Sequence, residues 1–367
     1  MRDRNEKVIF IGTPVWDWYL SFQELLKRKL CSLEGPLVHF FVDWLGLGSP
    51  SGLRARWGPL GGGPLELGDK HEPSSLPKDQ KGSSVELGSN EPIVGGSGPN
   101  AFEACGRVFG TEVALLIALV GADERGREAL SRLAQFGQVR EEFVSEFTPC
   151  NLVLEGPGNL VIKGKKPRIS DPPETFELPP GPLYVGPVYN RLWAELFLHE
   201  LVKRPFGAVN LTKSLASKKD SVWNFIVNQI LPKLPEGHLT FLNEDELEWI
   251  SGKSAIRDAL LWLRKRTATR LCVTLGVRGG LYVEGNSVWR WEVTPGEVVQ
   301  RTTLGDRLAG VWFGAEAQGE EPLEAMHLGV AAADIVALRG IQALTFSAVK
   351  DHEPKVHFAG SLSKLKL

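Results

Sequence analysis

The chain has 367 residues, enough for one large α/β domain with an insertion or for two domains. Hydrophobic residues make up 43% and charged residues 23% of the sequence, and the formal net charge of −2 gives no indication of a nucleic-acid partner or of an anionic membrane surface. No apolar run reaches the roughly 18 residues of a membrane span, and the scattered cysteines and histidines argue against a disulfide framework or a histidine-held metal. We therefore expect a cytoplasmic protein with no membrane or nucleic-acid partner.

The N-terminal quarter of the chain contains one clear strand and one unusual stretch. Residues 7–12 (KVIFIG) form an apolar run ending in glycine, which is typical of a strand buried in a parallel sheet. A short amphipathic helix is predicted for residues 21–30. The stretch from about 46 to 97 is dense in Gly, Pro and Ser, which predicts a mobile loop over part of it.

From residue 100 onward, the pattern predicts alternating strands and helices. Helices are expected at 100–109, 124–136, 222–231, 245–250, 254–265 and 308–317. Strands are expected at 113–120, near 208–209, at 239–242 and at 271–275. Residues 150–162 and 281–291 have the pattern of β-hairpins. This alternation predicts an α/β fold with a central, mostly parallel sheet covered by helices on both faces.

A glycine-rich segment, GGSGPN at residues 95–100, precedes the first of these helices. Glycine lets a backbone approach a ligand closely, and a helix N-terminus offers free N–H groups, so the segment is a candidate ligand loop as well as a plain loop end. Gly96-x-Gly98-x-x-Ala101 also fits a dinucleotide-binding pattern, which needs a strand directly before it. Residues 91–94 are short and follow a loop, so this alternative is weak.

Two later turns are also candidates for binding a phosphate. Residues 274–280 (TLGVRGG) follow an apolar strand, although a simple strand-to-hairpin turn would have the same appearance. In Thr303-Leu304-Gly305-Asp306 a carboxylate stands at the start of an apolar helix. A carboxylate there often only complements the helix dipole. Beside consecutive backbone N–H groups, however, it provides what phosphoryl transfer needs, which is a base and donors for the moving charge.

A further pair of oxygen-bearing side chains, Asn243 and Glu246, follows the strand at 239–242. Their spacing predicts a helix N-cap with a capping-box glutamate. The same oxygens at the end of a strand also suit a hydrated Mg²⁺, and the two roles are compatible.

Taken in chain order, these segments resemble the motifs of the ribokinase-like (PfkB) kinases of carbohydrates and nucleosides. The resemblance begins with GTPVWD at residues 12–17 and continues with GGSGPN at 95–100 and VGADERG at 120–126. It includes NEDE at 243–246, TLGVRG at 274–279, and TLGD at 303–306 in place of the family's GAGD signature. It covers about residues 7–20 and 93–345.

The resemblance implies a single ribokinase-like domain over residues 1–367. A small β-rich lid would come from residues of about 20–93 with the hairpin at 150–163. It implies transfer of the terminal phosphoryl group of ATP, or of ADP, to a hydroxyl of a sugar, a sugar phosphate or a nucleoside, with Mg²⁺ as cofactor. Neither the acceptor nor the oligomeric state follows from the sequence, and a homodimer stays open.

The resemblance also implies a role for each matched residue. Asp306 would take the proton of the acceptor, while the backbone amides of Thr303, Leu304, Gly305 and Asp306 stabilise the transferred phosphoryl group. The acceptor would be held by Asp17, Gly95, Gly96 and Asn100. The nucleotide would be held by Asn210, Thr274, Gly276 and Gly279, and Mg²⁺ would be organised through water by Asn243 and Glu246.

Three positions near the proposed base depart from the family pattern. Thr303 replaces the first glycine of the signature, Gln300 replaces the aspartate that commonly precedes it, and Arg307 replaces a small residue. These departures keep open a ribokinase-fold binding protein that has lost catalysis. A dinucleotide-dependent oxidoreductase is the third alternative.

Overall fold

The computed structural model describes residues 7–21, 93–155, 160–163, 167–188, 190–212, 225–300 and 302–365. The loop expected at 46–97 lies outside these residues as far as residue 92. The helix expected at 21–30 also lies outside them, apart from Ser21, which ends a strand. None of the described helices is both long and apolar enough to span a bilayer.

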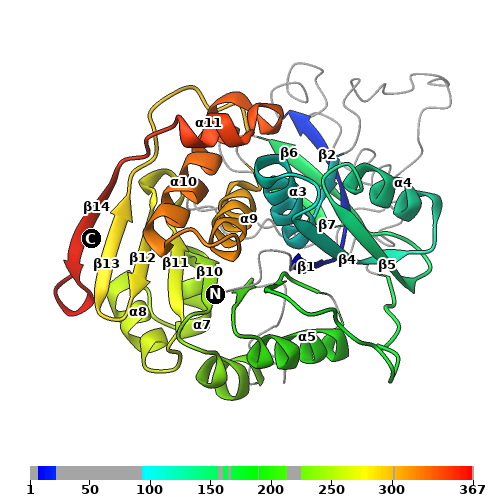
Figure 1. Cartoon of the computed structure of the whole chain (residues 1–367), viewed down its shortest axis with the longest axis horizontal. Helices are drawn as coiled ribbons and strands as arrows, with labels where there is room; N and C mark the ends of the chain where they lie inside the picture. The colour runs from blue at the N-terminus through cyan, green and yellow to red at the C-terminus, as the bar shows by residue number, and fades with distance from the viewer. Residues whose placement is uncertain are drawn as a thin grey trace, which may run out of the picture.

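A large sheet forms the centre of the described structure (Figure 1). Its strand order is β14-β13-β12-β11-β10-β9-β8-β1-β4-β5. The seven strands from β11 to β5 pair in parallel, and β12 to β14 add antiparallel pairs at one edge. The parallel strands are β1 (Val8–Gly12), β4 (Ala114–Gly121), β5 (Gln138–Ser145), β8 (Leu183–Val185), β9 (Gly207–Asn210), β10 (Leu239–Asn243) and β11 (Arg270–Thr274). The antiparallel strands are β12 (Gly280–Glu284), β13 (Ser287–Trp291) and β14 (Val356–Ser361).

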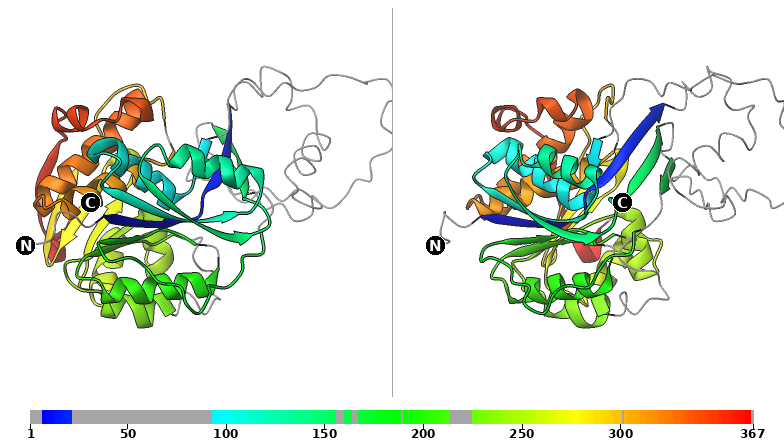
Figure 2. Two further views of the ribbon diagram at one scale, coloured as in Figure 1. Left: turned by 45° about the vertical axis from the view of Figure 1, so that its right-hand side comes forward. Right: turned by 90° about the vertical axis from the view of Figure 1, so that its right-hand side faces the viewer.

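Helices cover both faces of this sheet, as Figure 2 shows. One face carries α3 (Ser97–Phe109), α4 (Glu124–Leu133), α9 (Leu304–Ala317), α10 (Pro322–Arg339) and α11 (Phe346–Lys350). The other carries α5 (Arg191–Lys203), α7 (Glu244–Ser251), α8 (Ile256–Arg264) and a π-helix at Ile226–Ile230. In β1, Val8 and Phe10 point into the first core and Ile9 and Ile11 into the second, as the period of two of a strand requires. The predicted α/β fold with a mostly parallel sheet is confirmed.

A separate four-stranded sheet, of order β3-β2-β6-β7, lies beyond the layered body (Figure 2). It consists of β2 (Val15–Ser21), β3 (Ile93–Gly95), β6 (Cys150–Glu155) and β7 (Leu160–Lys163). β6 and β7 form the hairpin that the sequence predicts, and β2 joins β6 in parallel and β3 in antiparallel register. The hairpin expected in the lid, at 150–163, belongs to this sheet, whereas residues 22–92 of the expected lid lie outside the described residues.

Two helices begin earlier than the sequence pattern indicates. α3 begins at Ser97 rather than at residue 100, and α9 begins at Leu304 rather than at residue 308. Residues 97–100 and 304–306 of the predicted ligand segments therefore belong to the first turns of helices, and Gly96 and Thr303 directly precede them. Their side chains are fixed by helical geometry, and their backbone N–H groups are the free donors of a helix N-terminus.

Candidate active site

The first turns of α3 and α9 lie side by side because the two helices cross at small residues. A Cβ on Gly310 of α9 would come within 2.1 Å of the carbonyl oxygen of Ala101 of α3, so only glycine fits this crossing. The close contact brings Ser97 and Asn100 of α3 against Asp306 of α9. The sequence motifs at 95–100 and at 303–306 thus form one site.

Three side chains donate hydrogen bonds to the Asp306 carboxylate. Ser97 Oγ donates to Oδ1 at 2.6 Å and Asn100 Nδ2 to Oδ2 at 3.1 Å. Asn210 Nδ2 also reaches Oδ1, at 3.3 Å. Burial raises the pKa of Asp306, while these donors and the nearby charge of Arg307 act in the opposite direction. Oδ2 accepts one of these bonds only, so it keeps a lone pair for the proton of a further hydroxyl.

Ser97 lies within the predicted segment 95–100, but the sequence gives it no role of its own. Its hydroxyl donates to Asp306 and accepts a hydrogen bond from Asn210 Nδ2 at 2.6 Å. Asn210, the last residue of β9, was expected to hold the nucleotide, and in the structure its amide lies against Ser97 and Asp306. A serine before a helix ordinarily indicates an N-cap, and no local pattern reveals a partner in α9.

Asp17 lies close to this group at the start of the small sheet. Its Oδ1 accepts a hydrogen bond from Asn151 Nδ2 at 2.9 Å, and a Cβ on Gly95 would come within 2.0 Å of its Oδ2. Gly95 is thus required by the close approach of this carboxylate, while Gly96 is the residue that precedes α3. Burial raises the pKa of Asp17 to about 6, and the negative charge of Asp306 contributes to the increase. The ionisation of the expected acceptor residue Asp17 is therefore influenced by the charge of the expected base Asp306.

A small cavity of about 100 Å³ brings the predicted metal and nucleotide residues together with the base. Its lining includes Asn210, Asn243, Glu246, Thr274, Gly305 and Asp306. Asn243 and Glu246 form the capping box that the sequence predicts, with both reciprocal hydrogen bonds at 2.8 Å. The described residues contain no group of three or more His, Cys, Asp or Glu side chains that would cage a metal. Of the two carboxylates in the lining, Asp306 is bonded to Ser97, Asn100 and Asn210, and Glu246 as the one metal carboxylate fits a Mg²⁺ that keeps most of its water ligands.

The turn after β11 lies next to this cavity. Thr274 ends β11 and lines the cavity. Gly276 begins the 3₁₀ turn Gly276–Arg278 and Gly279 follows it before β12, and neither glycine lines the cavity. Both glycines have left-handed backbone angles, with φ of 59° and 81°. They shape the turn, and their contact with a nucleotide stays a prediction.

Each of the three departures from the family pattern has a partner in the structure. Thr303 has φ of 65°, a left-handed conformation that no other described residue except glycine adopts. Gln300 Nε2 donates to Thr303 Oγ1 at 3.2 Å. Arg307 is buried, where its Nη1 donates to the carbonyl oxygen of Asn100 at 2.6 Å and pairs with Glu103 Oε2 at 2.7 Å. The three residues that differ from the family pattern thus make contacts around the first turn of α9, where Asp306 lies.

A larger cavity of about 790 Å³ adjoins the same loop. Its lining includes Gly95, Asn100 and Thr303, and it shares no lining residue with the smaller cavity. Asp306, which lines the smaller cavity, lies next to two residues that line the larger one. Asn100 donates a hydrogen bond to the Asp306 side chain, and Thr303 directly precedes the helix that carries Asp306. The predicted acceptor residues Gly95 and Asn100 thus line one cavity, while the predicted metal pair and Thr274 line the other.

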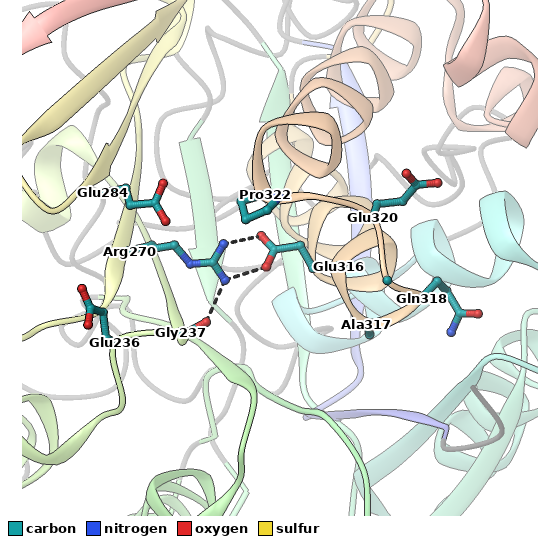
Figure 3. Close-up of a pocket in the computed structure, with 10 residues that line it drawn as sticks. Glu236, Gly237, Arg270, Glu284, Glu316, Ala317, Gln318, Glu320 and Pro322 are labelled. Atoms are coloured by element: carbon teal, nitrogen blue, oxygen red, sulfur yellow. Dashed lines mark hydrogen bonds and ion pairs between the residues drawn. The ribbon is translucent and has the colours of Figure 1, made fainter. Parts of the chain in front are cut away.

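A third cavity, of about 760 Å³, lies at the opposite ends of the strands (Figure 3). Arg270 begins β11, which ends at Thr274, and Glu316 lies in the last turns of α9. Arg270 donates to both carboxylate oxygens of Glu316, at 2.9 and 2.5 Å, and to the carbonyl oxygen of Gly237 at 2.7 Å. Trp312 Nε1 donates to Glu316 at 2.7 Å. The two terminal nitrogens of Arg270 and both oxygens of Glu316 are thus bonded within the protein, and only Arg270 Nε has no partner, so we regard the pair as structural.

The pattern Gly96-x-Gly98-x-x-Ala101 does not have the setting of a dinucleotide fingerprint. β3, which precedes it, pairs antiparallel with β2 in the small sheet rather than in parallel with a strand of a βαβ unit. The oxidoreductase alternative has no support from this topology.

Comparison with known proteins agrees with this geometry. Residues 215–343 match the sequence model of the pfkB family of carbohydrate kinases. The resemblance to the ribokinase-like kinases is confirmed. No curated protein matches the chain.

Solved structures agree over nearly the whole length. A fructokinase from Vibrio cholerae O395, in a fructose-, ADP- and calcium-bound form, has 13% identity and a TM-score of 0.65, covering 95% of this chain and 99% of that one. An adenosine kinase from Sinorhizobium meliloti has 15% identity and a TM-score of 0.64, with the same coverage. A ribokinase from Cryptococcus neoformans var. grubii serotype A in complex with ADP has 16% identity and a TM-score of 0.63, again with 95% and 99% coverage. At this identity the structures establish the ribokinase-like fold of this chain.

Proposed function

We propose that this chain is a kinase that transfers the terminal phosphoryl group of ATP, or of ADP, to a hydroxyl of a sugar, a sugar phosphate or a nucleoside. The observation that carries the proposal is the position of Asp306. Its carboxylate stands in the first turn of α9, within reach of the small cavity and bonded to Asn100 of the larger one. Similarity to sugar and nucleoside kinases supports the reaction class.

The reaction requires a base, and Asp306 has the properties of one. The acceptor hydroxyl would donate to Oδ2, which retains a lone pair, and its proton would pass to the carboxylate as the oxygen attacks the terminal phosphorus. The bond from that phosphorus to the bridging oxygen breaks, and the nucleotide leaves with one phosphate fewer. A pKa raised by burial makes Asp306 a stronger base than an exposed aspartate.

The first turn of α9 would stabilise the moving charge. Backbone N–H groups from Thr303 to Asp306 belong to the helix N-terminus, where the helix dipole also favours an anion. Asn243 and Glu246 would hold a hydrated Mg²⁺ in the small cavity, where the ion would neutralise charge on the phosphates of the nucleotide. A carboxylate has about four acceptor positions, so capping of α7 does not exhaust Glu246.

The small sheet would close over the acceptor as a lid. It carries Asp17 and Gly95, both expected to hold acceptor hydroxyls, and it stands apart from the layered body (Figure 2). Exclusion of water by such a closure limits hydrolysis of the nucleotide.

A second candidate function is a binding protein of this fold without catalysis, favoured by the left-handed Thr303 at the position of a family glycine. One experiment separates the two. Nucleotide consumption is measured with ATP and with ADP, in the presence of Mg²⁺, against a panel of neutral sugars, sugar phosphates and nucleosides, for the wild-type chain and for Asp306→Asn. Acceptor-dependent consumption that Asp306→Asn abolishes supports the kinase. Binding of panel members without consumption supports the binding protein.

A further inference from the structure

The larger cavity beside Asp306 carries an excess of positive charge. Among its described lining residues, three are arginines, Arg107, Arg132 and Arg307, and one is acidic, Glu103. Arg107 and Glu103 come from α3, Arg132 from α4 and Arg307 from α9. We call this space the arginine cavity. Because Gly95 and Asn100 line it too, the charge lies beside the residues that we propose for the acceptor.

Glu103 cannot neutralise all of these guanidinium groups. Its Oε1 pairs with Arg107 Nε at 2.9 Å and its Oε2 with Arg307 Nη1 at 2.7 Å, so one carboxylate is shared by two cations. Arg132 pairs with Glu128, but that pair is exposed on the surface of α4, and such pairs contribute little free energy. A net positive charge therefore remains in the cavity.

Arg307 also retains an unused donor. Its side chain is only 2% exposed, and its Nε has no hydrogen-bond partner. Burial of this Nε atom leaves it almost no accessible surface, so Arg307 contributes positive charge to the cavity rather than this donor. Arginine forks are the preferred partners of phosphate and carboxylate groups because they donate two parallel hydrogen bonds. An oxyanion is thus the ligand that the charge of the cavity favours.

We infer that the acceptor of this kinase carries an anionic group, a phosphate or a carboxylate, which binds in the arginine cavity. The inference rests on the proposed function and narrows its acceptor to sugar phosphates and sugar acids, in place of neutral sugars and nucleosides. A cavity of about 790 Å³ is large enough for a phosphorylated sugar. The acceptor hydroxyl would reach Asp306 Oδ2 beside Asn100, and the anionic group would lie toward Arg107 and Arg132.

The test measures binding by calorimetry on the full chain, without turnover. Ribose, ribose 5-phosphate and gluconate are compared, so that the last two distinguish phosphate from carboxylate. Arg132→Gln and Arg107→Gln should weaken the preferred anion by about tenfold or more and leave ribose unchanged, since each removes a charge-assisted hydrogen bond. Arg127→Gln is the matched control, because Arg127 is an exposed arginine of α4 that does not line the cavity.

The outcomes separate this inference from the proposed function. Tighter binding of an anion than of ribose, lost in the Arg132 and Arg107 variants and retained in the Arg127 variant, supports the inference. Equal binding of ribose and both anions, or anion binding that none of the variants changes, overturns it. Nucleotide consumption with neutral acceptors alone would overturn the inference and leave the kinase standing. Arginine-dependent anion binding with no consumption for any acceptor would overturn the kinase and leave the anion site standing.

Discussion

Ser97 Oγ donates a 2.6 Å hydrogen bond to Asp306 Oδ1, although the two residues are 209 positions apart in the sequence. The contact joins the first turns of α3 and α9, and Asn210 of β9 donates to both partners. The pKa of Asp306 thus results from two opposed effects, since burial raises it and the three donors lower it. Each effect can be changed separately by substitution.

Replacing the base should remove turnover while leaving binding intact. Asp306→Asn keeps the shape of the side chain but cannot accept a proton at pH 7, so we expect kcat to fall by about 10²–10⁴-fold. Calorimetry should show nucleotide and acceptor affinities within a few-fold of wild type. Asp258→Asn, at an exposed aspartate of α8, serves as the control and should retain full activity. A kcat for Asp306→Asn within about threefold of wild type would exclude Asp306 as the base.

Removing the Ser97 hydroxyl should shift the pH dependence of the reaction. A hydrogen bond to a carboxylate stabilises its charged form, so Ser97→Ala should raise the pKa of Asp306 further. Activity requires the deprotonated base, and the acidic limb of the kcat profile should therefore move to higher pH. Ser97→Thr, which retains a hydroxyl, should lie nearer to wild type. If Ser97→Ala lowers kcat equally at every pH, Ser97 does not act through the ionisation of Asp306.

The sequence predicts the elements that are marked by neighbouring residues, such as an apolar run or a capping box. The apolar runs of β1, β10 and β11 and the capping box of Asn243 and Glu246 all appear in the structure. α10 was not predicted, because most of its middle is buried on several sides and carries no amphipathic period. The role of Ser97 was also missed, since its partner lies on a distant helix. This contact depends on the crossing of α3 and α9 at Gly310, and residues close to Ser97 in the sequence give no indication of that crossing.

The buried Asp17 carboxylate should lower the free energy of unfolding at neutral pH. Burial raises its pKa from 3.8 to about 6, so between about pH 4 and pH 6 the folded chain binds more protons at this group than the unfolded chain does. The free energy of unfolding should therefore decrease as pH rises through this window and stay level above it. Asp17→Asn should be more stable than wild type by up to about 3 kcal/mol at pH 8, and the difference should vanish below pH 4.

Urea unfolding at a series of pH values measures this difference. A constant offset between Asp17→Asn and wild type across the whole range would contradict the raised pKa. If Asp17 also holds acceptor hydroxyls, the same variant should raise KM for the acceptor, because a neutral amide accepts weaker hydrogen bonds than a carboxylate.

Glu246 has a structural role in the cap of α7 and a proposed role in binding Mg²⁺, and the substitution Glu246→Gln distinguishes the two. Glutamine can serve in a capping box, so Glu246→Gln should leave the stability of α7 nearly unchanged. It removes the negative charge beside the small cavity, so the Mg²⁺ concentration for half-maximal rate should rise. Glu248→Gln, an exposed residue of the same helix outside the cavity lining, is the control. An unchanged Mg²⁺ requirement for Glu246→Gln would leave Glu246 with the cap alone.

The Arg270–Glu316 pair should stabilise the fold without taking part in the reaction. Both side chains of the pair (Figure 3) are nearly buried, at 6% and 5% exposure. Glu316 lies near the end of α9, whereas Asp306 lies in its first turn. Glu316→Gln preserves an acceptor for Trp312 Nε1 but leaves the Arg270 charge buried without a counter-charge. Loss of one partner of a buried pair costs about 3–5 kcal/mol, so the midpoint of urea unfolding should fall sharply.

Arg270→Met in the Glu316→Gln background should restore part of this loss, because removing the uncompensated charge outweighs losing the hydrogen bond to the Gly237 carbonyl. The double variant should therefore be less destabilised than the sum of the two single variants, which a double-mutant cycle measures directly. Well below the unfolding midpoint, all three variants should keep the kcat of wild type. Additive single effects would show that the two charges do not interact. A fall in kcat for a variant that is still fully folded would show that the far end of α9 influences Asp306.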